Sequence, residues 1–195
     1  MSGAWQLDRV GAALEEALDG AVDGPVLLRT GVRPMALGWA TVELDRAAAS
    51  LAGELSLPPE AFENAAETIA LGARCRLARG VLTGGASLVL LEPATEGRLA
   101  ASLARLGEGP AAVWLSVPGL AATVAALRAV GVATSAECSG PFGPERLILG
   151  GPVHGPHRLL IRLPAVPSAH DRRSADLAST SPTGRCGSDR CPVHR

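Results

Sequence analysis

The strongest constraint on the fold is a strand-and-helix pattern that occurs twice along the chain. The first copy runs from Trp39 into an alanine-rich stretch at 45–55, and the second runs from Trp114 into a similar stretch at 120–130. A valine follows each tryptophan by three residues, and the two tryptophans are 75 residues apart. Apolar residues recur at helical spacing in both alanine-rich stretches. We therefore predict a duplicated module in which a strand precedes a helix.

Further strands are expected in each module. The stretch at 74–79 alternates between polar and apolar residues, which is the period of a half-buried strand. Short apolar runs are typical of buried strands, and two of these runs end at a proline, Pro93 and Pro164. Residues 95–106 are expected to form a short helix, whereas 60–71 fits either a helical turn or a surface loop. The predicted strands lie at 74–79, 86–93, 134–138, 145–149 and 158–164.

Composition divides the chain into three parts. The stretch at 5–19 has apolar residues at helical spacing and predicts an amphipathic helix. The C-terminal stretch is rich in Ser, Thr, Pro and Arg and has no apolar periodicity, so it cannot bury enough surface to offset its ordering entropy. The predicted parts are an N-terminal helix and strand extension at 1–36, a two-module domain at 37–164 (modules 37–93 and 111–164) and a disordered tail at 165–195.

The balance of charge excludes several classes of partner. The formal net charge is −1, so no basic excess favours a nucleic acid or an anionic membrane surface. No apolar run reaches the roughly 18 residues that a membrane span requires, and the N-terminus lacks the pattern of a secretory signal. We therefore expect a reduced, cytoplasmic protein. Every basic residue is an arginine, which excludes a Schiff-base lysine and a P-loop lysine.

The two tandem βαβββ modules resemble the vicinal oxygen chelate (VOC) superfamily, which includes the glyoxalase, bleomycin-resistance and extradiol dioxygenase proteins. The layout is most similar to the methylmalonyl-CoA epimerase branch, because a strand ends in Leu91-Glu92-Pro93 and Gly107-Glu108-Gly109 precedes the second module. The resemblance covers about residues 37–164. It implies an α+β fold in which the two modules form a curled mixed sheet around a central cleft.

The resemblance also implies a divalent metal in the cleft of the enzymes of this superfamily. There, a histidine near the start of each first strand and a Glu or Gln on each last strand supply the ligands. A hard cation needs imidazole, carboxylate or carbonyl donors, which aliphatic side chains lack. We therefore expect no metal and no cofactor. The nearest carboxylate, Glu92, is expected on the opposite strand face from the ligand position. The positions to which the ligand pattern maps are Leu37, Ala112, Val89 and either Leu160 or Arg162.

Two histidines and one glutamate are the candidate catalytic residues. His154 and His157 stand before the last predicted strand, at a spacing that suits a shared metal or an acid and base near neutral pH. The plainer alternative is a pair of turn residues among glycines and prolines. Glu92 is the third candidate, because it is the carboxylate nearest to the ligand position.

Five further residues are candidates for ligand binding, and a sixth, Arg76, is considered together with one of them, Arg74. Phe142 lies in a stiff Gly-Pro loop and is expected either to cover an apolar ligand or to fold onto the core. Arg146 follows that loop. Arg74 and Arg76 alternate on one strand and suit a carboxylate or phosphate, although such a pattern also marks the solvated face of a sheet. The remaining candidates are the repeat tryptophans, Trp39 and Trp114, which either line the cleft or pack in the core.

Four cysteines are too few for a disulfide scaffold in a chain of 195 residues. Cys75 and Cys138 fall in predicted strands and are expected to be small core residues. Cys186, Cys191 and His194 in the tail resemble half of a zinc site, but a structural zinc site needs four ligands held by a fold. We expect no metal there.

Three functions remain open from the sequence. The first is a VOC-fold protein without the metal ligands, which binds a small apolar or acidic molecule in its cleft. The second is a lyase or isomerase with relocated ligands, drawn from Glu92, Glu137, His154 and His157. The third is a non-catalytic assembly protein that uses the N-terminal helix as a contact surface. The sequence favours the binding protein, with a small-molecule ligand, no nucleic-acid or membrane partner, and the possibility of a homodimer.

Overall fold

The computed structural model describes residues 31–149 and 156–162. The predicted helix at 5–19, the predicted tail at 165–195 and His154 lie outside these residues. The extension and the tail therefore stay predictions, and the structure bears on the two modules.

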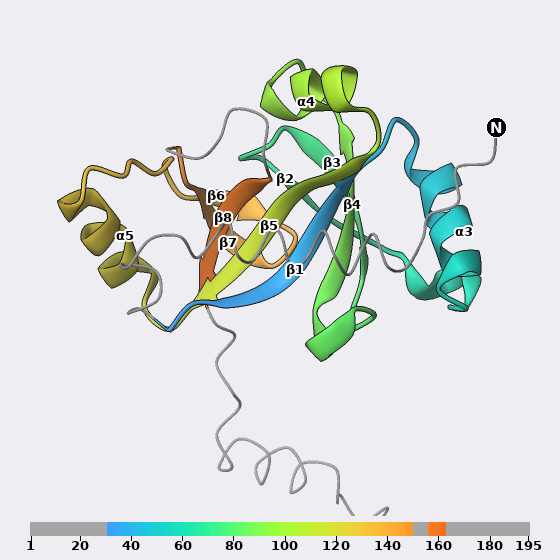
Figure 1. The fold of residues 1–195 in the computed structure, drawn as a ribbon, viewed down its shortest axis with the longest axis horizontal. Coiled ribbons are helices and arrows are strands. Elements are labelled where there is room, and N and C mark those ends of the chain that lie inside the picture. Colours follow the sequence, from blue (N-terminus) through green and yellow to red (C-terminus); the bar gives the residue numbers. More distant parts are fainter. Residues whose placement is uncertain (1–30, 150–155, 163–195) are drawn as a thin grey trace, which may run out of the picture. The chain divides into compact units, whose positions relative to one another are not determined.

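The described residues form two βαβββ modules in tandem, as the sequence predicted (Figure 1). The stretch at 60–71, which the sequence left open, forms a short 3-10 turn at Pro59–Ala61 followed by a strand. The elements are β1 Arg33–Ala40, α3 Leu44–Glu54, β2 Glu63–Thr68, β3 Ala73–Ala78, β4 Ser87–Pro93, α4 Arg98–Leu106, β5 Gly109–Val117, α5 Leu120–Ala129, β6 Cys138–Gly140, β7 Gly143–Leu147 and β8 His157–Arg162.

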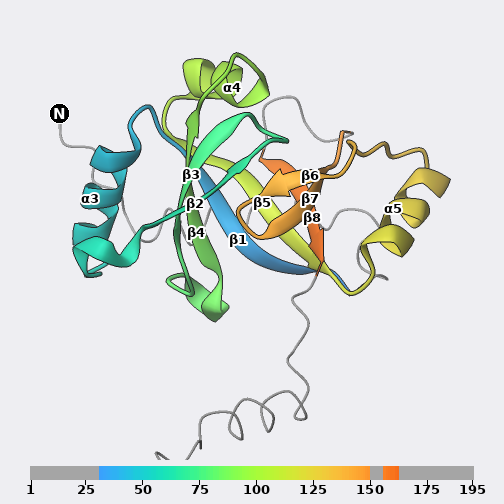
Figure 2. The same cartoon turned by 180° about the vertical axis from the view of Figure 1, so that it is seen from behind.

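The eight strands form one mixed sheet in the order β2-β3-β4-β1-β5-β8-β7-β6. The first strands of the two modules, β1 and β5, pair antiparallel at the centre, and each pairs in parallel with the last strand of its own module. The sheet curls until its two edges meet. At their junction, the Ile69 N–H, just after β2, donates to the Ser139 carbonyl of β6 at 3.1 Å. We call this junction the seam. Figure 2 shows β2 and β6 facing each other across this seam. The mixed sheet is thus nearly closed into a barrel.

Two apolar clusters lie on the two faces of the curled sheet. The outer cluster packs β1, β4, β5 and β8 against α3 and α5, which flank the sheet on opposite sides (Figure 1). Helix α3 is held there by one buried stripe that includes Ala48 and Leu51. The inner cluster fills the concave face, and Leu99 of α4 is fully buried in it. The concave face is therefore a second core.

The structure corrects the repeat offset by one residue. Helices α3 and α5 begin 76 residues apart, at Leu44 and Leu120. The same offset relates Leu37 and Val113, which pair with each other across β1 and β5. Because side chains alternate along a strand, an error of one residue exchanges the two faces of the sheet. Trp39 accordingly lies in the outer cluster, whereas Trp114 lies in the inner one.

The corrected offset places Gly38 where the second module has Trp114. A Cβ on Gly38 would stand 2.8 Å from Cζ3 of the Trp114 ring and 2.8 Å from Cβ of Ala112. The indole of the second module therefore occupies the space above the glycine of the first. Position 38 requires a glycine because the Trp114 ring lies too close to the backbone there to leave room for a Cβ.

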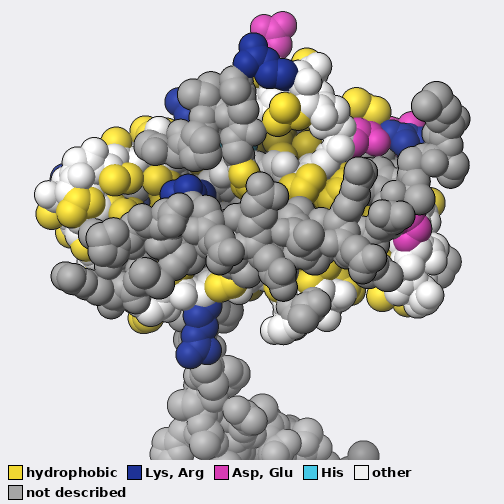
Figure 3. Space-filling model, viewed as in Figure 1, with side chains coloured by type: hydrophobic (Ala, Val, Ile, Leu, Met, Phe, Trp, Pro, Cys, Tyr) yellow, Lys and Arg dark blue, Asp and Glu magenta, His cyan; other side chains and the backbone are white. Residues whose placement is uncertain are grey.

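None of the helices in the described ranges is both long and apolar enough to span a membrane. Figure 3 shows α5, at the left, as a surface of mainly hydrophobic and uncharged side chains. Val130, just after this helix, is 57% exposed.

Candidate functional site

The concave face of the sheet, where the sequence predicted a central cleft, is filled by side chains. Trp114 of β5 is fully buried there, among Val89, Leu91 and Leu159. Phe142, in the turn between β6 and β7, places its ring edge-on to Trp114 with centroids 5.7 Å apart and an angle of 68°. Of the two arrangements expected for Phe142, the structure has the ring folded onto the core.

A buried carboxylate, Glu145 of β7, lies against this tryptophan. The Trp114 indole N–H donates to Glu145 Oε2 at 2.8 Å, and the Thr68 hydroxyl donates to Oε1 at 2.5 Å. Thr68 belongs to the edge strand β2 and Glu145 to β7, the neighbour of the other edge strand β6, so the second of these bonds also crosses between the two ends of the curled sheet. Burial raises the pKa of Glu145, and the two hydrogen bonds only partly oppose that effect. The carboxyl group is a component of the seam.

Cys75 of β3 lies on the same concave face. Burial raises the pKa of its thiol to about 12, so the thiolate is scarce at neutral pH. The prediction that Cys75 is a small core residue is confirmed by its burial.

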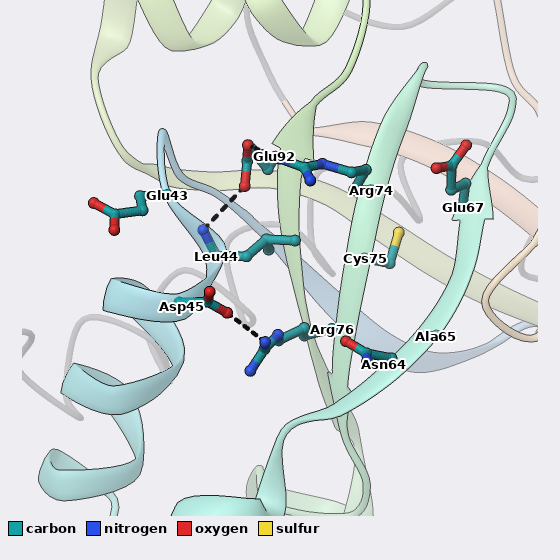
Figure 4. Close-up of a pocket in the computed structure, with 10 residues that line it drawn as sticks. All are labelled: Glu43, Leu44, Asp45, Asn64, Ala65, Glu67, Arg74, Cys75, Arg76 and Glu92. Atoms are coloured by element: carbon teal, nitrogen blue, oxygen red, sulfur yellow. Dashed lines mark hydrogen bonds and ion pairs between the residues drawn. The ribbon is translucent and has the colours of Figure 1, made fainter.

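An open groove lies between the start of α3 and strands β2 and β3, on the first module (Figure 4). Its volume is about 400 Å³, within the usual range of small-molecule sites. The β2–β3 register shifts between Ala65 and Thr68, and this irregularity lets the groove reach Cys75. The residues that line it are Glu43, Leu44, Asp45, Asn64, Ala65, Glu67, Arg74, Cys75, Arg76 and Glu92.

Two ion pairs lie along the groove. Arg74 pairs with Glu92 on the neighbouring strand β4, and Arg76 pairs with Asp45 in the first turn of α3. The other carboxylate oxygen of Glu92 accepts the Leu44 N–H at 3.1 Å, so this side chain satisfies one of the free donors at the start of the helix. Glu92 therefore fixes α3 to the sheet. It lies at the groove, away from the concave face that holds Val89, as the sequence predicted.

No family model and no curated protein matches the sequence. Comparison with solved structures, however, identifies proteins with the same arrangement of strands and helices. Methylmalonyl-CoA epimerase from Mycobacterium tuberculosis superposes with a TM-score of 0.57 at 21% identity, over 67% of this chain and 87% of that one. A Streptomyces coelicolor methylmalonyl-CoA epimerase variant, in complex with 2-nitronate-propionyl-CoA, gives 0.56 at 23% identity, over 69% and 96%. The chain has the VOC fold. A hypothetical protein from Bacillus halodurans C-125 shares this VOC fold, with a TM-score of 0.56 at 16% identity over 69% of this chain and 96% of that one.

Two of the positions to which the metal-ligand pattern was mapped, Val89 and Ala112, lie on the concave face and have no donor atoms in their side chains. Two positions to which the ligand pattern was mapped, Leu37 and Leu160, lie in the outer cluster instead, which corrects their predicted place. Their inward-facing neighbours, among them Ala36 and Leu159, also have no donor atoms in their side chains. Within the described ranges, no group of three or more His, Cys, Asp or Glu side chains is arranged to hold a metal.

His157 begins β8, pairs with Ala112 of β5 and is 8% exposed. Its Nε2 atom has no hydrogen-bond partner among the described residues. Burial lowers its pKa, and the positive charge of Arg98 lowers it further, so the imidazole is neutral at pH 7. Glu145 pairs with Ile161, four residues further along β8. That separation is about 13 Å along a strand, too far for His157 and Glu145 to share a ligand.

The remaining predicted binding residues have structural partners. Arg146 donates to the Ser135 carbonyl at 3.1 Å and approaches Glu137 at 3.6 Å, which holds the segment before β6. Trp39 is 6% exposed and belongs to the outer cluster. Of the five predicted ligand-binding residues, Arg74 is the one that lines the groove.

Two carboxylates that matter in the structure were missed by the sequence reasoning. Glu145 lies two residues before Leu147 in β7, so both side chains point to the same face of the sheet. The alternation of side chains along β7 could therefore have predicted an inward-facing glutamate. Glu108, in the predicted Gly-Glu-Gly turn, accepts from the Thr41 hydroxyl at 2.6 Å and the Val42 N–H at 2.9 Å, and pairs with Arg46 at 2.6 Å. Partial burial raises the pKa of Glu108, but these donors outweigh it, and the net pKa is lowered. Glu108 thereby joins the two modules.

Proposed function

We propose that this chain is a small-molecule-binding protein that uses the VOC fold without the metal chemistry of its enzymes. Its ligand binds in the groove beside α3, and the concave face serves as a core. The observation that carries this proposal is the placement of Arg74 and Arg76 in an open groove of about 400 Å³. Guanidinium groups are well suited to bind carboxylate and phosphate oxygens.

The packing of the concave face supports the same proposal. A ligand there would have to displace Trp114, which is fully buried, and break the hydrogen bond between Thr68 and Glu145. The groove needs no such rearrangement. The sequence predicted a small apolar or acidic ligand in the cleft. This proposal keeps the acidic alternative and moves the ligand to the groove.

The test is a thermal-shift screen of the full chain against a panel of small carboxylates, phosphates, amines and amino acids. We expect at least one acidic or amphoteric compound to raise the melting temperature, because a ligand that binds only the folded state adds RT ln(1 + [L]/Kd) to the free energy of unfolding. Arg74→Gln and Arg76→Gln should remove that shift. Arg79→Gln is the matched control, because Arg79 follows the same strand, is exposed and does not line the groove.

Two results would contradict the proposal. One is a panel in which no compound stabilises the protein, and the other is a shift that survives in the Arg74→Gln, Arg76→Gln double variant. Mn²⁺ is included separately, because it prefers oxygen ligands and so avoids the tail cysteines. Stabilisation of the wild type by Mn²⁺ would favour the metal-dependent enzyme.

A second candidate function is favoured by one observation, the buried carboxyl group of Glu145 with its raised pKa. A perturbed carboxyl group is a common acid or base in isomerases and lyases. This candidate requires the seam to open so that a substrate reaches Glu145. Turnover that is lost in Glu145→Gln and unaffected in Arg74→Gln would favour it over the binding protein.

A further inference from the structure

We infer that the groove takes a small zwitterion, a molecule that carries one acidic group and one ammonium group; this inference rests on the proposed function. It follows from the arrangement of charge in the groove. The lining has four carboxylates, Glu43, Asp45, Glu67 and Glu92, against the two guanidinium groups of Arg74 and Arg76. The formal charge of the lining is therefore negative, although its two cations lie together on β3.

The two arginines have donors to spare for an acidic group. Each makes one ion pair within the described part of the chain, Arg74 with Glu92 and Arg76 with Asp45. A guanidinium has five N–H donors in a planar fork, so a second acceptor can bind beside the first. Figure 4 shows the two side chains extending from the same strand into the groove.

The ammonium group would be bound by Glu67 of β2. Glu67 is exposed, lines the groove from the wall opposite α3 and makes no ion pair with the residues that the structure describes (Figure 4). Asp45 and Glu92 are already paired with the arginines, and Glu43 approaches Arg46 at 3.6 Å. Glu67 is thus the carboxylate of the lining whose charge is still to be balanced.

Simpler ligands fit the groove less well. A dianion would add negative charge to a lining that is already negative, and a simple cation would approach the two arginines without an anion between them. A zwitterion places each of its charges against the opposite one. Because the groove is open to solvent, the charges supply selectivity more than affinity, and binding should weaken as salt is added.

Titration calorimetry of the full chain with a matched set of probes tests this inference. The zwitterions are 4-aminobutanoate, 5-aminopentanoate and 6-aminohexanoate, which differ in the separation of their charges. Butanoate and butylammonium each carry one of the two charges alone. We expect the best zwitterion to bind about tenfold more tightly than either single-charge probe, since 1.4 kcal/mol of added interaction is a factor of ten.

Variants separate the two ends of the ligand. Glu67→Gln should weaken the zwitterion about tenfold and leave butanoate unchanged, whereas Arg76→Gln should weaken both. Glu63→Gln is the control, because Glu63 is an exposed carboxylate on the same strand that does not line the groove.

The outcomes distinguish the ligand class from the site. If butanoate or butylammonium binds as tightly as every zwitterion, or if Glu67→Gln leaves zwitterion binding unchanged, the class is wrong. If no probe binds and the panel compounds that stabilise the protein through Arg74 and Arg76 do not include an amino acid, the class is also wrong and the proposed function stands. If neither the probes nor the panel bind, both are wrong.

Discussion

The seam inside the barrel and the groove beside α3 both contain carboxylates. The two carboxylates differ in the groups that donate hydrogen bonds to them. Glu145 in the seam is fully buried and receives only neutral donors, an indole N–H and a hydroxyl, so burial dominates and its pKa is raised. Glu92 in the groove is paired with a guanidinium group that is 57% exposed. A buried carboxylate without a cation favours the neutral form, whereas an ion pair with an exposed guanidinium group contributes little to stability and can exchange partners. The seam is therefore suited to hold the fold together and the groove to exchange partners.

Removal of the Trp114 indole should lower the free energy of unfolding more than any other substitution considered for the seam or the groove. Trp114→Ala deletes a fully buried ring and leaves Glu145 without its indole donor, so we expect a loss of about 3–5 kcal/mol in the free energy of unfolding. Urea unfolding measures this loss. Arg76→Gln in the groove is the matched comparison and should change the free energy of unfolding by less than about 1 kcal/mol. Equal losses in the two variants would remove the distinction between seam and groove.

A methyl group on the glycine that faces the indole should have the next largest effect. In Gly38→Ala the new Cβ would stand 2.8 Å from both the Trp114 ring and the Ala112 Cβ, so we expect a loss of about 1–3 kcal/mol from overpacking. Gly53→Ala is the control, because a Cβ at that helical position meets nothing within 4 Å. The control should be neutral or stabilising by up to about 1 kcal/mol. A Gly38→Ala variant as stable as the wild type would show that the indole can move aside.

The raised pKa of Glu145 predicts a pH dependence of stability. Because the folded state holds this proton more tightly than the unfolded chain, its stabilising contribution is complete below the unfolded pKa and is lost as pH rises through the folded pKa. Glu145→Gln removes this titration and keeps an acceptor for the indole N–H. We expect the variant to gain on the wild type as pH rises from 4 to 7, by at most about 1.4 kcal/mol per pH unit.

Urea unfolding at several pH values between 4 and 7 measures the difference between the two proteins. Glu63→Gln on the exposed edge of β2 controls for the general effect of charge. A difference between Glu145→Gln and the wild type that stays constant with pH would mean that the pKa of Glu145 is the same in the folded and unfolded states.

The smallest effect is expected at the joint between the modules. The pKa of Glu108 is lowered, so its contribution to stability is present above the unfolded pKa and is lost as pH falls through the folded pKa. Glu108→Gln should cost less than about 1 kcal/mol at pH 7, since its cationic partner Arg46 is half exposed. The cost should become smaller as the pH falls from 7 towards 3. A cost that does not change with pH would assign the stabilisation to the hydrogen bonds from Thr41 and Val42 alone.

The order of the elements was predictable because periodicity and proline positions report local structure. Strands β3 and β4 and helices α3, α4 and α5 lie where those patterns placed them. The face of the sheet that each strand residue occupies was harder to predict. Trp39 and Trp114 suggested a repeat offset that is wrong by one residue, since similar composition does not fix which side of a strand a residue occupies.

Arg74, Arg76 and Glu92 were predictable as candidate residues, but the groove that brings them together was not, because it depends on long-range structure. Asp45 and Arg76 meet only when α3 packs beside β3, and the groove depends on an irregular register between β2 and β3. Glu145 was treated as an ordinary strand residue, because a glutamate in a strand is usually on the solvated side. Its burial depends on Thr68, which lies 77 residues earlier in the chain.

The exchange of Gly38 for Trp114 has a consequence for how the duplicated halves can assemble. Two copies of the first half, joined through the same central strands, would leave a hole where the ring now sits. Two copies of the second half would bring two rings into a space that holds one. Each half has thus become specific for the other, and an ancestor built from identical subunits could not have carried the present residues at this position.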